Sequence, residues 1–101
     1  MTNLVKACKV SDIPQSEGRT IECQGTSVAV FNVNGQFHAV DNTCPHRGGP
    51  LGEGSLDGAT VTCPWHGWQF DVTTGSSPVN PMARIQKYQV KVEGEDLYID
   101  L

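Results

Sequence analysis

Short segments in which apolar and polar residues alternate, separated by turn residues, make up most of this chain. Alternation with a period of two is typical of strands that bury one face, whereas apolar positions at helical spacing are sparse. The pattern predicts strands over residues 4–10, 19–23, 27–33, 36–40, 59–62, 68–72, 84–92 and 96–101. The sequence therefore predicts an all-β fold.

Turn residues join these strands into hairpins. Asn34-Gly35 gives the strongest signal, because both residues tolerate the positive φ angles of a two-residue hairpin turn. Glu93-Gly94-Glu95 is expected to join the last two strands. Further turns or loops are expected at Gly52, Gly54, Asp57-Gly58 and residues 76–81. With 101 residues and no internal repeat, residues 1–101 are expected to form one domain, with an insertion at about 42–75.

Two short clusters within this insertion carry the candidate chemistry. They are Cys44-Pro45-His46 and Cys63-Pro64-Trp65-His66, and sixteen residues separate them. Each cluster offers one thiolate and one imidazole, so together they form a Cys2His2 set of metal ligands. The prolines stiffen the two turns, and neighbouring glycines allow the backbone to approach a bound group closely. The sequence therefore predicts a metal centre held by Cys44, His46, Cys63 and His66.

Three other interpretations of these clusters are open. Zinc also accepts two cysteines and two histidines, although zinc fingers usually pair Cys with Cys and His with His. A Cys–His nucleophilic pair would need a third, orienting group, and none is evident. The last possibility is that all four are ordinary core residues, which four ligand residues in one spacing pattern make improbable.

The spacing C-x-H-x16-C-x-x-H resembles that of Rieske iron–sulfur proteins, and the residues flanking both clusters resemble that family too. The flanks are Arg47-Gly48-Gly49-Pro50-Leu51 and Gly67-Trp68-Gln69-Phe70-Asp71. The resemblance implies one [2Fe–2S] cluster per chain, with Cys44 and Cys63 on one iron and His46 and His66 on the other. It also implies an antiparallel β-sandwich or barrel with a small cluster-binding subdomain of two loops.

The resemblance further implies an electron carrier. Ring-hydroxylating oxygenases contain, besides the iron–sulfur cluster, a mononuclear iron held by two histidines. In this chain only His38 remains after His46 and His66 are assigned to the cluster. We therefore expect no enzyme activity, but a ferredoxin that accepts electrons from a flavin-dependent reductase and donates them to a terminal oxygenase. The alternatives are the Rieske-type small subunit of a nitrite reductase and a zinc-stapled interaction module. Electron exit and partner docking are expected at His46, His66, Arg47, Gly48, Trp65 and Pro78.

Composition and charge indicate which partners and which cellular location to expect. The net charge of -4 and the absence of a basic patch argue against nucleic acid as a binding partner. The N-terminus has no long apolar run, so we expect no membrane anchor, a cytoplasmic location and a monomer. Cys8 and Cys23 lie outside the motif and are expected to be small buried or half-buried thiols, with a disulfide between them as the alternative. His38 is expected to be a surface or half-buried strand residue.

Respiratory Rieske proteins differ at four positions. They carry an extra cysteine in each loop, where this chain has Gly49 and Trp65. They also place a serine and a tyrosine hydroxyl near the cluster, where this chain has Trp68 and Phe70. By this comparison the chain lacks the loop disulfide and the two hydroxyl donors. The resemblance therefore implies a low midpoint potential for the cluster.

Overall fold

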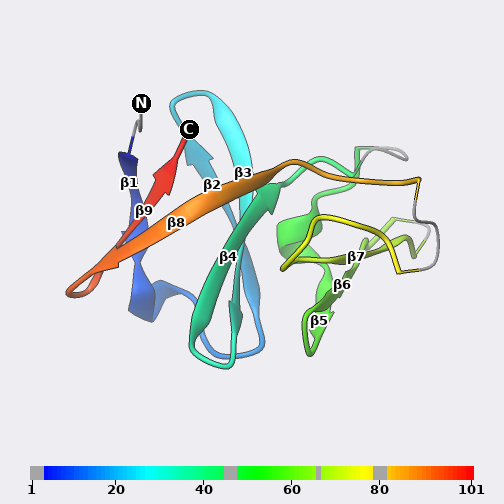
Figure 1. Ribbon diagram of the computed structural model, residues 1–101, viewed down its shortest axis with the longest axis horizontal. Helices are drawn as coiled ribbons and strands as arrows, with labels where there is room; N and C mark the ends of the chain where they lie inside the picture. Colours follow the sequence, from blue (N-terminus) through cyan, green and yellow to red (C-terminus); the bar gives the residue numbers. More distant parts are fainter. Residues whose placement is uncertain (1–3, 45–47, 66, 79–81) are drawn as a thin grey trace.

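The structure is a computed structural model, and it describes residues 4–44, 48–65, 67–78 and 82–101. These residues form strands in two antiparallel sheets, with two short 3-10 turns and no α-helix among them (Figure 1). The expected all-β fold is confirmed. The elements are β1 (Leu4–Lys9), η1 (Val10–Asp12), β2 (Gly18–Cys23), β3 (Thr26–Val33), β4 (Gln36–Asp41), η2 (Leu51–Glu53), β5 (Ser55–Asp57), β6 (Thr60–Thr62), β7 (Gln69–Asp71), β8 (Lys87–Glu93) and β9 (Asp96–Asp100).

The larger sheet has the strand order β1-β9-β8-β4-β3-β2. Its edge strands β1 and β2 approach each other, so the sheet curls towards a barrel. The smaller sheet has the order β5-β6-β7 and lies to one side of the larger one (Figure 1). We call the described part of residues 42–86, which holds η2 and the smaller sheet, the small lobe.

Strand β3 is buried on both faces, because it lies between two apolar cores. Val28 and Val30 face the interior of the curled sheet, and Ala29 and Phe31 face the small lobe. The continuous apolar segment 28–31 reflects this double burial. The first core also contains Leu97 and Ile99, and the second contains Leu51, Val61 and Phe70.

The turns between the strands match the residues that occupy them. Asn34 and Gly35 have φ angles of 52° and 86°, which suit the two-residue turn predicted between β3 and β4. Gln24 and Gly25 have φ angles of 48° and 81° and make a similar turn between β2 and β3. Both turns keep the strands in register, so the apolar residues of β3 stay on their proper faces.

Two expectations about the strands were wrong. Ser55–Asp57 forms strand β5 and not only turns, because Leu56 pairs with Val61 on β6. Residues 84–86 lie outside β8, because Ile85 donates its N–H to the carbonyl of Gly75 at 2.8 Å instead of continuing the strand. Among the described residues, no helix is long and apolar enough to cross a membrane.

Candidate metal centre

Cys44 lies at the base of the first motif loop, three residues after the end of β4. Its N–H donates to the carbonyl of Gly49 at 3.0 Å, and its own carbonyl accepts from the N–H of Gly48 at 2.7 Å. Thr43 and Pro50 form an isolated β-bridge just outside these bonds. The loop therefore folds back on Cys44 and fixes its direction.

Cys63 lies at the end of the β6–β7 hairpin. Thr62 pairs with Gln69, and the N–H of Cys63 donates to the carbonyl of Trp68 at 2.7 Å, which closes the second motif loop. Inside this loop Gly67 has a φ angle of 74°, a conformation that glycine adopts without strain. Each motif cysteine is thus held by the backbone at the base of its loop.

The structure brings the two cysteines together. Both are almost fully buried, with exposures of 1% for Cys44 and 2% for Cys63, and they belong to one core. Burial raises the pKa of the Cys63 thiol above its ordinary value, the backbone N–H of Trp65 lowers it by donating to the sulfur, and Cys44 raises it through a hydrogen bond and charge repulsion. Two buried thiols in such contact are suited to a shared cation, which stabilises both thiolates at once.

Gly49 leaves the room in which the Cys63 sulfur sits. A Cβ atom at position 49 would lie 2.6 Å from the Cys63 sulfur and 3.2 Å from the Cβ of Trp65. Such distances are well below van der Waals contact, so a side chain at this position would force the Cys63 sulfur or Trp65 to move. The donor chemistry, the burial and this space fit an iron–sulfur cluster bound at the two cysteines.

The other motif residues are only partly described. His46, Arg47 and His66 lie outside the described residues, so their placement as ligands or docking residues stays a prediction. Within the described residues no group of three or more metal-ligating side chains is found, as expected when only the cysteine half of the set is included.

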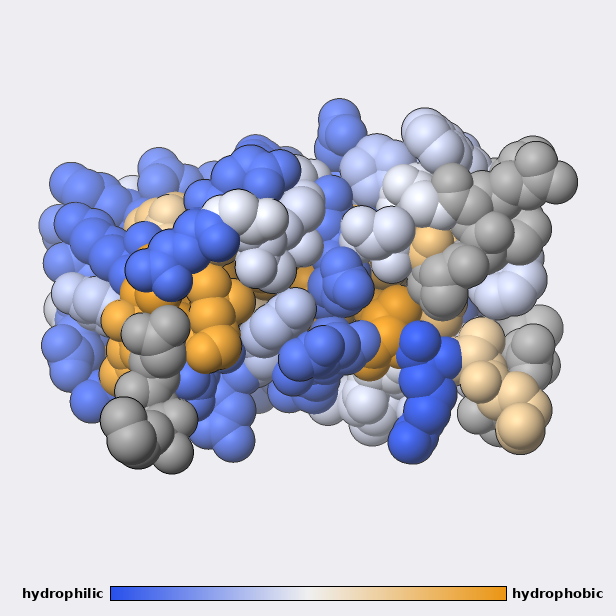
Figure 2. Space-filling view, turned by 90° about the horizontal axis from the view of Figure 1, so that it is seen from above, coloured by the Kyte–Doolittle hydropathy of each residue, from blue (hydrophilic) through white to orange (hydrophobic). Residues whose placement is uncertain are grey.

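Three of the predicted docking residues are described, and all are exposed. Gly48 and Pro78 are at the surface, and Trp65 is 50% exposed. Sequence reasoning missed Met82, whose side chain is 88% exposed in the segment that returns towards β8. Figure 2 shows hydrophilic and hydrophobic residues mixed at both ends of this face, with pale residues more common towards the small lobe. The exposed Trp65 and Met82 both belong to the small lobe, which makes this lobe a candidate contact surface.

Comparison with known proteins decides the family. The family described as "Rieske [2Fe-2S] domain" matches residues 3–96. The chain belongs to the Rieske [2Fe–2S] family. Its cofactor is a [2Fe–2S] cluster, one per chain. The family match therefore favours this cluster over zinc as the group bound by the Cys2His2 set.

Two relatives show what this Rieske chain is similar to. The 3-phenylpropionate/cinnamic acid dioxygenase ferredoxin subunit of Shigella boydii serotype 4 (strain Sb227) is 40% identical over 101 residues, which cover 98% of this chain and 94% of that protein. Human apoptosis-inducing factor 3 is 39% identical over 93 residues, which cover 91% of this chain. The chain spans only 15% of the human protein, so the activity of that whole protein does not transfer.

A solved structure supports the Rieske fold. It is described as a complex of reduced oxygenase and oxidized ferredoxin in carbazole 1,9a-dioxygenase. The match has a TM-score of 0.88 and 32% identity, and covers 99% of this chain and 94% of that chain. The expected antiparallel Rieske-type fold is therefore confirmed.

The structure shows how the residues of this Rieske chain pack at the positions where it differs from the respiratory type. Positions 49 and 65, where respiratory members carry their extra cysteines, are in direct contact, since a Cβ at 49 would lie 3.2 Å from that of Trp65. Here glycine and tryptophan pack against each other in place of a disulfide. Trp68 and Phe70 have ring centroids 6.5 Å apart and bring no hydroxyl group to the site.

The cysteines outside the motif are free thiols. Cys23 is buried and Cys8 is half-buried, as expected, and both border the core of the curled sheet. The structure does not join them in a disulfide. Burial raises the pKa of Cys8 to about 11, and Asp12 and Cys23 add to this by charge repulsion. The Cys8 thiol is therefore protonated at neutral pH, and it packs against the core of the curled sheet rather than that of the motif cysteines.

His38 is half-buried on β4, in agreement with the expectation. Burial lowers its pKa below the ordinary 6.5, Lys87 lowers it further, and Asp71 opposes them.

The lowered pKa of His38 predicts a loss of stability in acid. The folded state resists protonation of His38, so the unfolded chain binds the proton first as pH falls below about 6.5. We expect the free energy of unfolding to decrease as the pH falls from about 7 to about 5, and to decrease less in His38→Gln. Urea unfolding at each pH measures this, and equal pH slopes in both proteins would contradict it.

Proposed function

We propose that this chain is a one-electron carrier that accepts electrons from a flavin-dependent reductase and passes them to a terminal ring-hydroxylating oxygenase. The observation that carries the proposal is the pair of buried thiols, Cys44 and Cys63, directly below exposed residues of both motif loops. The dioxygenase ferredoxin relative and the ferredoxin–oxygenase complex support the oxygenase partner. The reductase is the partner that such a carrier needs as its electron source.

The ligand assignment belongs to this proposal. Cys44 and Cys63 hold one iron, and His46 and His66 hold the other. When bound, the [2Fe–2S] cluster supplies a site that stores and releases a single electron. The protein's part is to bury both thiolates and to donate the N–H of Trp65 to the Cys63 sulfur. Such outer contacts tune the potential of the bound group.

No catalytic step is assigned to the chain itself. The chain has three histidines, and two of them are committed to the motif. The third, His38, lies half-buried on β4 beside Lys87 and Asp71. A two-histidine iron site cannot be built from one remaining histidine, so the oxidation of an organic substrate is proposed to take place outside these 101 residues. The monomeric state and the cytoplasmic location stay predictions.

The small lobe is less acidic than the rest of the chain. Residues 42–86 hold Glu53, Asp57 and Asp71 against Arg47 and Arg84, a formal charge of -1 out of the total of -4. Partners are proposed to dock around Arg47, Gly48, Trp65 and Pro78, with electrons leaving through His46 and His66. Met82 is a further exposed apolar residue of the small lobe.

We expect Arg47→Glu to slow electron transfer to the oxygenase about tenfold at low salt, because charge steering accelerates association. Stopped-flow kinetics across a salt series measures this, and the difference should shrink as salt rises. Lys91→Glu is the matched control, since it makes the same charge change at an exposed residue of β8 that pairs with Glu93. Equal slowing in both variants, or no salt dependence, would contradict docking at Arg47.

We expect a midpoint potential near the low end of the Rieske range, about -150 to -50 mV. Trp68 and Phe70 stand where respiratory members have hydroxyl donors, so fewer hydrogen bonds stabilise the added electron. For the same reason the potential should change little between neutral and mildly acidic pH. Protein-film voltammetry across pH measures both quantities. A midpoint well above zero, or a steep slope at neutral pH, would place the chain with the respiratory type.

Reconstitution tests the proposed function as a whole. The purified holoprotein should support substrate oxidation by a ring-hydroxylating oxygenase when it is supplied with a flavin-dependent reductase and NADH. Affinity capture with the tagged holoprotein should retain those two partners. Capture of a nitrite reductase catalytic subunit instead would favour the small-subunit alternative. Iron and acid-labile sulfide analysis would expose a zinc-stapled interaction module, which contains neither.

A further inference from the structure

Asn42 is a buried polar residue at the junction between the large sheet and the small lobe. It follows β4 directly, lies two residues before Cys44 and is 7% exposed. A buried amide is costly unless its polar atoms are paired. Its hydrogen bonds therefore show what it connects.

The side chain of Asn42 joins three elements. Its Oδ1 atom accepts from the N–H of Gly52 at 2.7 Å and from the hydroxyl of Thr20 at 3.2 Å. Its Nδ2 atom donates to the hydroxyl of Ser27 at 3.1 Å. One amide thus connects η2 of the small lobe to β2 and β3 of the large sheet.

The backbone of Asn42 closes the first motif loop. Its carbonyl accepts from the N–H of Leu51 at 2.8 Å, and its N–H donates to the carbonyl of Ser27 at 3.2 Å. The loop that carries Cys44 therefore begins at Asn42 and returns to it at Leu51 and Gly52. The approach is close, because a Cβ at position 52 would lie 2.5 Å from the Thr20 hydroxyl.

We propose that Asn42 is a positioning residue for the metal centre, which holds the Cys44 loop at a fixed place on the large sheet so that Cys44 meets Cys63. The proposal rests on the proposed ligation by these cysteines. The cysteines follow different strands, since Cys44 comes three residues after the end of β4 and Cys63 comes directly after β6. Their mutual position depends on how η2 sits on β2 and β3, and the Asn42 amide makes the polar contacts across that junction.

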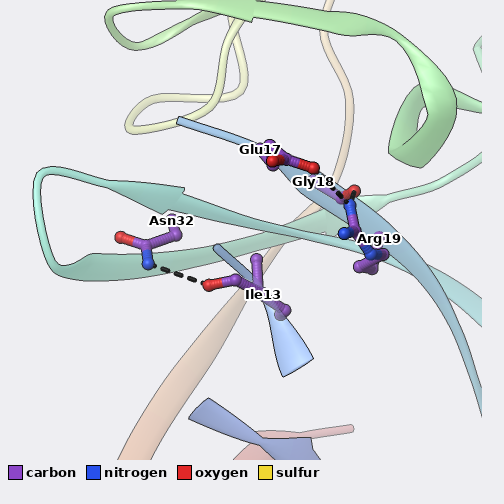
Figure 3. A network of polar contacts seen from close by, with 5 residues as sticks. All are labelled: Ile13, Glu17, Gly18, Arg19 and Asn32. Carbon is purple, nitrogen blue, oxygen red and sulfur yellow. Dashed lines mark hydrogen bonds and ion pairs between the residues drawn. The ribbon is translucent and has the colours of Figure 1, made fainter. Parts of the chain in front are cut away.

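The chain offers a matched control in Asn32. It is 8% exposed, and its Nδ2 atom donates to the carbonyl of Ile13 at 2.9 Å (Figure 3), while its Oδ1 atom accepts from the N–H of Gly35 at 2.9 Å. It lies near the opposite end of β3 from Ser27, about 16 Å along the strand. Asn32 therefore has the same residue type and burial as Asn42, but it ties a turn of the large sheet.

The experiment compares Asn42→Ala with Asn32→Ala in the holoprotein. Loss of visible absorbance under an iron chelator gives the rate of cluster release, and thermal unfolding of both variants gives the general loss of stability. Partners that orient metal ligands typically change metal affinity about tenfold to a hundredfold when replaced. We expect cluster release to be faster by about that factor in Asn42→Ala alone, together with a shifted midpoint potential.

Equal release rates in Asn42→Ala and Asn32→Ala, at comparable losses of stability, would overturn the proposal. If Asn42→Ala gives no holoprotein, Thr20→Val decides in its place, because it removes one donor to Asn42 and leaves the amide intact. Faster release in Thr20→Val than in Asn32→Ala supports the role, and equal release refutes it. A wild-type protein without iron and sulfide would instead defeat the proposed function, so the two failures are distinguishable.

Discussion

Replacing Cys44 or His66 with alanine should abolish the visible chromophore and markedly lower the melting temperature. Cys44 is 1% exposed and contacts Cys63 within the core of the small lobe, so its loss removes a proposed ligand and leaves a cavity. In a chain of 101 residues, cluster binding should contribute directly to folding. Since 1 kcal/mol moves the melting temperature of such a domain by about 4–8 °C, we expect a decrease of about 10 °C or more. Absorbance spectra and thermal unfolding followed by circular dichroism measure both effects.

Cys8→Ser and Cys23→Ser are the controls for the ligand variants. Both cysteines border the core of the curled sheet, away from the motif loops, and the raised pKa of Cys8 disfavours its thiolate. Their spectra should match that of the wild type. Loss of the chromophore in either serine variant, or its retention in Cys44→Ala, would overturn the ligand assignment.

Gly49→Ala should weaken cluster binding about tenfold to a hundredfold, the range seen when contacts that orient metal ligands are changed. The added methyl group would lie 2.6 Å from the Cys63 sulfur and 3.1 Å from the Cγ of Trp65, so one of them must move. Position 49 cannot yield easily, because its carbonyl accepts the N–H of Cys44. The methyl group is therefore expected to displace the sulfur of Cys63, a proposed ligand. Iron content after purification and the rate of bleaching under chelator measure this loss.

Gly58→Ala separates this clash from the general cost of replacing a glycine. Gly58 has a φ of 61° in the turn between β5 and β6, and nothing lies within 4 Å of a Cβ built there. Its replacement costs backbone strain of about 1 kcal/mol and should leave the iron content unchanged. If Gly49→Ala retains its iron as fully as Gly58→Ala, the Cys63 sulfur does not need the space that Gly49 leaves.

Much of the fold follows from local sequence patterns. The strands with clear alternation and the Asn34-Gly35 turn depend on neighbouring residues, so they are predictable from short segments. Strand β5 is different, because Ser55–Asp57 is too short to show a pattern and exists through pairing with β6. Likewise the start of β8 depends on Gly75, which holds Ile85 out of the strand.

The candidate metal centre also has parts that are predictable from the sequence and parts that are not. The cysteines were predictable because their spacing within the motif is a property of the sequence, and the structure brings Cys44 and Cys63 together. Asn42 was not predictable as a connecting residue, since its partners Thr20, Ser27 and Gly52 come from three separate segments. The exposure of Met82 depends on tertiary folding and could not be read from its neighbours.

The pairing of β1 with β9 places the two ends of the described chain together. Leu4 is opposite Asp100 in this pair, and Figure 1 shows both ends on the side of the molecule away from the small lobe. A covalent fusion at either end would therefore leave the motif loops free to reach a redox partner. A flexible tether to a reductase would replace diffusional encounter by an effective concentration in the millimolar range for a short linker. The same geometry allows a domain of this kind to be one segment of a longer polypeptide, as the matched stretch is in the human relative.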